Sequence, residues 1–153
     1  DRSRLRLGES TVLEIQAPRE VAAFMELYLE LVARELYAEA FFGGKVSDEV
    51  KASVRARLTK NIPAFKRLAK FAPYVAGSEF TLADAAGYAA LPTVGQATKA
   101  VLGEDLLAAA GIDWKAYMKL LGERPSVQRV NADRKRDLEA MAAAQANPAP
   151  ARS

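Results

Sequence analysis

The segment from Gly77 to Val94, GSEFTLADAAGYAALPTV, constrains the fold more than any other part of the chain. Between Glu79 and Lys99 the only charged residue is Asp84, three positions after Thr81. This is the spacing of a capping box, in which a hydroxyl and a carboxylate satisfy the first free amides of a helix. The helix that follows is apolar all round, as is typical of a helix at the centre of a bundle, where water cannot satisfy those amides. The sequence therefore predicts an interior helix that starts at Thr81, with Asp84 as a structural rather than a catalytic carboxylate.

Apolar residues at three- and four-residue spacing predict a first helix from Pro18 to Phe42. Pro18 fits the first turn, and Gly43 and Gly44 end the helix. Its expected buried face consists of Val21, Phe24, Met25, Tyr28, Leu31, Val32 and Leu36.

A second helix is expected from the N-cap Ser47 to Gly77, with Pro63 bending or dividing it. Its predicted buried face consists of Val50, Val54, Leu58, Ile62, Phe65 and Ala69.

Two more helices are predicted after the central one. One runs from about Trp114 to Leu121 with Asp113 as N-cap, and the other follows Pro125. Alternation of period two occurs only in STVLEIQ, near the start. We therefore predict an all-α bundle of about five to six helices around the buried helix at Thr81. We expect a linker at residues 1–17, the helical domain at 18–143 and a flexible tail at 144–153.

The composition limits the possible chemistry. The 153 residues suffice for one domain with a core, and half of them are hydrophobic. No apolar run is long enough to cross a bilayer. Cysteine and histidine are absent, which excludes thiolate chemistry and removes the usual general base and the commonest metal ligand. We expect no metal and no membrane partner.

Three segments, in this order and spacing, resemble the C-terminal helical domain of the glutathione S-transferase family. They are ELYLELVARELYAEAFFGGKVSDEV, FTLADAAGYAALP and WKAYMKLLGERPSVQRV. In that family a Ser/Thr-x-x-Asp capping box opens the central helix, and an aromatic-bearing helix runs into Arg-Pro-Ser before the last helix. The resemblance covers about Pro18 to Arg136. The family's N-terminal thioredoxin-like domain, which holds glutathione and activates its thiol, has no counterpart in this sequence.

The resemblance implies roles for residues of the first helix. Arg34, Tyr37, Ala38 and Phe41 would line the pocket for a hydrophobic electrophile, although core or dimer packing explains the aromatic residues equally well. Glu30 and Glu35 lie near positions that reach the glutathione amine of a neighbouring subunit, although exposed glutamates are usually only solvated. By resemblance, the whole protein would be a cytoplasmic homodimer that conjugates glutathione, its co-substrate, to small electrophiles.

A non-enzymatic protein-interaction module of the same fold is the alternative. Seven basic residues and no acidic one occur from Lys51 to Lys70, which gives this alternative some support. These residues spread around the helix instead of forming a stripe. The aromatic residue within this stretch, Phe65, lies on the predicted apolar face, so no aromatic residue stands among the basic ones for base stacking. We therefore expect a solvated or partner-facing surface and no nucleic acid.

Overall fold

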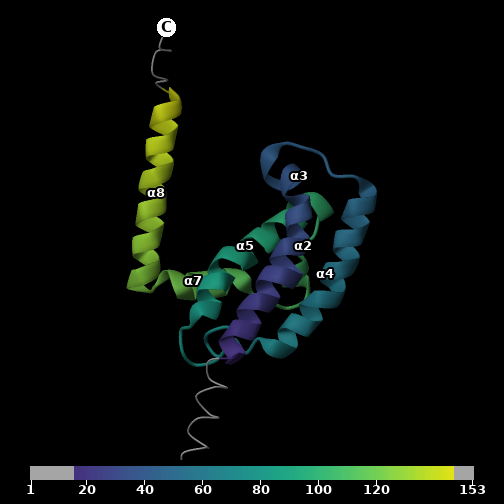
Figure 1. Ribbon diagram of the computed structural model, residues 1–153, viewed down its shortest axis with the longest axis horizontal. Coiled ribbons are helices and arrows are strands. Elements are labelled where there is room, and N and C mark those ends of the chain that lie inside the picture. The colour runs from purple at the N-terminus through teal and green to yellow at the C-terminus, as the bar shows by residue number, and fades with distance from the viewer. Residues whose placement is uncertain (1–15, 147–153) are drawn as a thin grey trace, which may run out of the picture. The chain divides into compact units, whose positions relative to one another are not determined.

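The computed structural model describes residues 16–146 of the chain, and side chains up to residue 143 (Figure 1). Within the described part all regular structure is helical, and the sole extended pairing is an isolated bridge between Tyr74 and Gly77. The predicted all-α class is confirmed. Nearly all of the STVLEIQ pattern, most of the expected linker and the end of the tail lie outside the described residues.

The first helical segment runs from residue 16 to Phe42 but is not a regular α-helix. After residues 16–24 it passes through π-helical η1 (Met25–Glu30), α2 (Leu31–Ala33), 3₁₀-helical η2 (Arg34–Leu36) and α3 (Tyr37–Phe42). The segment ends at Gly43, whose φ of 72° is left-handed, as in many helix ends.

The buried face of this segment differs from the prediction. It contains Val21, Ala22, Met25, Leu29, Val32, Ala33 and Leu36. Tyr28 and Leu31, expected in the core, are 51% and 48% exposed, so that part of the prediction was wrong. The segment carries apolar side chains over a wider arc than the core covers, and periodicity alone does not select which part of the arc is buried.

The second helix, α4 (Asp48–Leu68), begins as predicted. The Ser47 hydroxyl accepts a hydrogen bond from the Val50 amide at 3.3 Å. Four residues of the predicted face are buried, namely Val54, Leu58, Ile62 and Phe65. Pro63 does not divide the helix, and α4 ends at Leu68 rather than at Gly77. Residues 69–80 form a loop instead, in which Phe71 has a φ of 47°.

Helix α5 (Leu82–Leu102) is the central element, in contact with η1, α2, η2, α3, α4 and α6 (Leu106–Ala109). Figure 1 shows it beside the first helical segment. Small residues such as Gly87 and Ala90 are buried on its inner side. Helix α5 is not covered all round, however, because Ala85 and Ala89 are exposed. Pro92 lies within the helix without ending it, and Gly103 (φ 78°) ends it.

Two helices complete the chain, α7 (Trp114–Gly122) and α8 (Pro125–Ala146). Both were predicted, and the Asp113 carboxylate caps α7 by accepting from the Ala116 amide at 3.0 Å. The described chain forms two compact units, with the boundary between Met118 and Lys119. In the second unit, surface ion pairs of α8 join Arg136 to Asp133 and Lys135 to Glu139.

Candidate functional site

The Asp84 carboxylate is completely buried and binds three segments of the chain. Its Oδ2 accepts from the Thr81 amide at 2.8 Å, which is one half of a capping box. Its Oδ1 accepts from the Val75 amide at 3.0 Å and from the Tyr117 hydroxyl at 2.5 Å. The carboxylate therefore holds together the start of α5, the preceding loop and α7. The three donors that bind it are all groups of this chain.

Tyr117, which donates to this carboxylate, belongs to a cluster of aromatic rings. The Phe71 ring lies 5.2 Å from the Tyr117 ring and 6.2 Å from that of Phe65, edge to face in both pairs. Burial and the hydrogen bond to Asp84 raise the pKa of Tyr117 far above its usual value. Both side chains are buried and bonded to each other, which is a structural arrangement.

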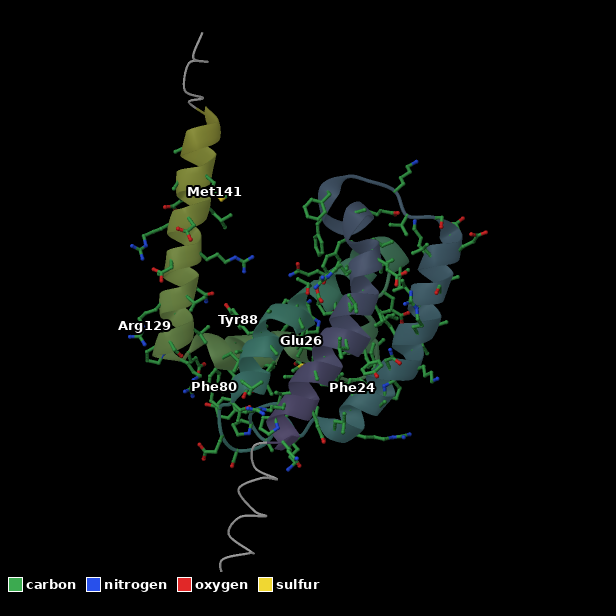
Figure 2. All side chains as sticks on the ribbon, in the orientation of Figure 1. Phe24, Glu26, Phe80, Tyr88, Arg129 and Met141 are labelled. Atoms are coloured by element: carbon green, nitrogen blue, oxygen red, sulfur yellow. The ribbon has the colours of Figure 1, made fainter. Side chains whose placement is uncertain are left out.

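A cleft of about 440 Å³ lies between the first helical segment and α5. The first segment contributes Glu26, Leu27, Glu30, Leu31 and Arg34, and α5 contributes Ala86, Ala89, Ala90 and Thr93. Figure 2 labels Glu26 on this stretch of the first segment, which includes the π-helix. Small alanine side chains on α5 leave the room, and π-helical turns often occur at functional sites. The volume is in the range of small-molecule sites.

Two polar side chains that line this cleft, Glu30 and Arg34, are bonded to each other, and Tyr37 beside the cleft is bonded to Glu30. Both nitrogens of the Arg34 fork donate to Glu30, with Nη2 to Oε2 at 2.6 Å and Nε to Oε1 at 3.2 Å. The Tyr37 hydroxyl donates to Glu30 Oε1 at 3.2 Å. Burial raises the pKa of Tyr37 above its usual value, and the negative charge of Glu30 raises it further. Tyr37 is therefore a neutral hydrogen-bond donor over the ordinary pH range.

Comparison with known proteins gives one decisive match. No family model matches the chain. A curated glutathione S-transferase from Pseudomonas putida F1 is 40% identical over 125 residues, which are 80% of this chain and 55% of that protein. The chain belongs to the glutathione S-transferase family. It spans about half the length of this relative, and its all-helical structure fits the C-terminal domain of the family.

The other residues that the family resemblance singled out are spread along the segment. Phe41 is 42% exposed and its ring meets that of Tyr37 edge to face at 5.2 Å. Ala38 is exposed but is not among the residues that line the cleft. Glu35 accepts from Arg57 of α4 at 2.6 Å, on another side of the segment from Glu30. Of the six proposed residues, the structure brings together Glu30, Arg34, Tyr37 and Phe41.

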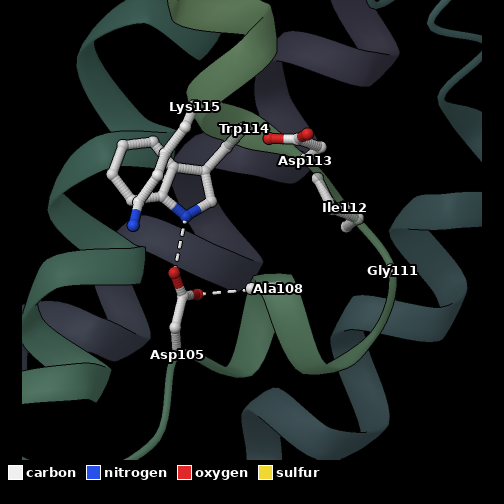
Figure 3. A pocket seen from close by; sticks show the side chains of 7 residues that line it. All are labelled: Asp105, Ala108, Gly111, Ile112, Asp113, Trp114 and Lys115. Carbon is white, nitrogen blue, oxygen red and sulfur yellow. Dashed lines mark hydrogen bonds between the residues drawn. The ribbon is translucent and has the colours of Figure 1, made fainter.

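A second cavity of this transferase-family domain, of about 310 Å³, lies beside Trp114 (Figure 3). Its polar groups are already engaged, because Asp105 accepts from the Trp114 indole at 2.8 Å and from the amides of Leu107 and Ala108. The indole packs on Gly95, where a Cβ would lie 2.5 Å from Nε1. This cavity therefore lies at the edge of a packing contact, because the Trp114 side chain is buried against α5.

Much of the basic surface of α4 is bonded within the domain. Lys51 pairs with Glu39 at 2.9 Å, Arg55 with Glu104 at 3.1 Å, and Arg57 with Glu35 at 2.6 Å. Lys66 donates to the carbonyl of Ala110. These bonds favour the predicted surface role over a nucleic-acid site.

Of the nine residues that line the cleft, sequence reasoning singled out only Glu30 and Arg34 as site residues. The α5 wall was missed because the apolar stretch around Asp84 indicates a helix buried on every side. The available signal was the small size of Ala86, Ala89 and Ala90, since alanines on a central helix leave space that larger side chains would fill. Glu26 and Leu27 carried no distinguishing pattern.

Neither metal ligands nor a membrane span stand out in the described part. Among residues 16–146 no group of three or more acidic side chains is arranged to hold a metal ion. None of the helices in that range is long and apolar enough to cross a membrane.

Proposed function

We propose that the chain is the C-terminal domain of a glutathione transferase and that the cleft between η1 and α5 holds a small hydrophobic electrophile. The observation that carries this proposal is the cleft itself, in which alanine and leucine side chains surround a few bonded polar groups. The 40% identity to a protein named glutathione S-transferase supports the chemistry.

In this proposal the chain positions the electrophile and does not activate the thiol. The chain has no cysteine, so the attacking thiolate would be that of glutathione, and it has no histidine to deprotonate that thiol. In this proposal glutathione is held outside the described residues. When the electrophile is held beside the thiolate, the bimolecular reaction becomes effectively unimolecular. The entropy cost of bringing the two groups together has then been met on binding, which lowers the barrier to attack. Tyr37, a neutral donor already bonded to Glu30, would hold the Glu30–Arg34 pair in place beside the electrophile.

The proposal includes a cytoplasmic homodimer. Apolar side chains of the first segment remain exposed outside the cleft, among them Tyr28 at 51% and Phe42 at 80%, as expected for a surface that another subunit covers. Glu35, on another side of the segment from Glu30, would be the residue that faces the glutathione amine across that interface, and glutathione would be the co-substrate.

The test is conjugation of glutathione to chlorodinitrobenzene by the full-length protein that carries this chain, with retention on immobilised glutathione as a second readout. Ala89→Leu fills the cleft and should raise KM several-fold or abolish turnover. Ala100→Leu adds the same bulk at an exposed position of α5 outside the cleft, and should leave turnover unchanged.

Absence of both turnover and retention in the full-length protein would refute the enzymatic proposal. The interaction module would then be the remaining function of this fold. Equal effects of the two leucine substitutions would place the electrophile elsewhere.

A further inference from the structure

We propose that Glu30 determines which electrophiles the cleft accepts, by excluding those that carry a negative charge. This inference rests on the proposed function of the cleft and adds the substrate class. The cleft would take uncharged or cationic aromatic electrophiles and discriminate against carboxylated or sulfonated ones.

The first argument is the state of the hydrogen-bond donors. An anionic ligand would need the Arg34 guanidinium, the only basic group among the lining residues, or the Tyr37 hydroxyl beside it. Glu30 already accepts from both nitrogens of the Arg34 fork and from Tyr37. The Glu30 side chain is only 18% exposed and that of Arg34 is 60% exposed, so the carboxylate is held on the inner side of the pair. An anion must therefore displace a preformed bidentate pair.

The second argument is the charge of the lining. Glu26, one turn before Glu30, is exposed and has no ion pair within the described residues. Two carboxylates against one guanidinium leave an excess of one negative charge at the cleft. The wall on α5 has no charge to offset it, since it consists of three alanines and Thr93. In a cleft open to water, one such charge at a separation of about 4 Å disfavours an anion by about fivefold in affinity.

The third argument is what remains for a ligand once these donors are occupied. Leu27, Leu31 and the three alanines offer apolar contact, which is indifferent to the charge of a substituent elsewhere on the ligand. Discrimination between anionic and uncharged ligands therefore arises at the polar end of the cleft, where Glu30 is bonded to both Arg34 and Tyr37.

The test measures binding without turnover, so its failure is distinguishable from failure of the conjugation assay. Two fluorescent probes of similar shape are titrated into the full-length protein, the uncharged phenylnaphthylamine and the anionic anilinonaphthalene sulfonate. Glu30→Gln keeps the size of the side chain and removes its charge. It should raise affinity for the anionic probe about fivefold and change that for the uncharged probe by less than about twofold.

Matched variants separate this role from a structural one. Glu26→Gln should act in the same direction and more weakly, because Glu26 is more exposed and faces no guanidinium. Glu104→Gln breaks a carboxylate–guanidinium pair with Arg55 outside the cleft and should change neither affinity. Added salt should reduce the discrimination of the unmodified protein, because it screens the charge.

The proposal is overturned if Glu30→Gln leaves the ratio of the two affinities unchanged, or weakens both probes equally. It is also overturned if both probes still bind to the Ala89→Leu variant with full affinity, because the discrimination would then arise outside the cleft.

Discussion

Replacing Asp84 with asparagine tests the central packing argument. The side chain is fully buried and accepts from two backbone amides and a phenol, at 3.0, 2.8 and 2.5 Å. An asparagine oxygen can take the place of Oδ1 and accept from Val75 and Tyr117. Its amino group then faces the Thr81 amide, donor against donor. Asparagine therefore cannot reproduce the three bonds.

The expected loss follows from these contacts. One buried amide without an acceptor costs about 1–3 kcal/mol, and two hydrogen bonds to a charged acceptor become bonds to a neutral one, at about 1 kcal/mol each. We expect Asp84→Asn to lower the free energy of unfolding by about 3–5 kcal/mol, a large part of the 5–15 kcal/mol typical of a domain.

The assay is urea unfolding followed by the fluorescence of Trp114, the single tryptophan of the chain. Asp113→Asn is the matched control, because Asp113 caps α7 at an exposed position and asparagine is an equally good N-cap. That control should change stability by less than about 0.5 kcal/mol. A loss below about 1 kcal/mol for Asp84→Asn would refute the view that the carboxylate holds three segments together.

Three further predictions concern single contacts. Gly95→Ala places a Cβ 2.5 Å from the Trp114 indole nitrogen and should lower the free energy of unfolding in urea by about 1–3 kcal/mol. The control Gly122→Ala, where a Cβ would have no atom within 4 Å, should not lower it. Equal effects of the two substitutions would contradict the close packing at Gly95. Ser47→Ala removes the N-cap of α4 and should cost about 1 kcal/mol, and an unchanged urea midpoint would argue against the cap. Burial raises the folded-state pKa of Tyr117, so its contribution is complete below the unfolded pKa of about 10 and declines as the pH rises beyond it. Stability measured from pH 8 to 11 should accordingly fall less steeply for Tyr117→Phe than for the unmodified chain, and parallel profiles would contradict the assignment.

Local patterns in the sequence predicted the helices well. The Ser47 cap, the buried face of α4 and the helix at Pro125 each depend on residues within one or two turns, so their signals are complete in a short stretch. Helix α4 ends nine residues before the predicted Gly77, because the loop that follows is stabilised by distant partners. Val75 of that loop bonds to Asp84, and Phe71 packs on Tyr117.

The cleft was harder to predict than the helices. The residues that line it depend on which side of the first segment faces α5. That side depends in turn on the π-helical stretch Met25–Glu30, whose ordinary helix-forming residues give no sign of irregularity. Resemblance pointed to Arg34 and Tyr37. The bonds that both make to Glu30 became apparent only from the structure.

The hydrogen bond from the Val75 amide to Asp84 has a consequence for how the domain opens. Val75 lies in a loop, yet its side chain is fully buried and its amide is bonded to an interior carboxylate. Deuterium can reach this amide only when the loop separates from Asp84 and the buried Val75 side chain leaves the core, so its exchange should be about as slow as that of the core helices. A segment without regular structure would thus be among the last parts of the molecule to unfold.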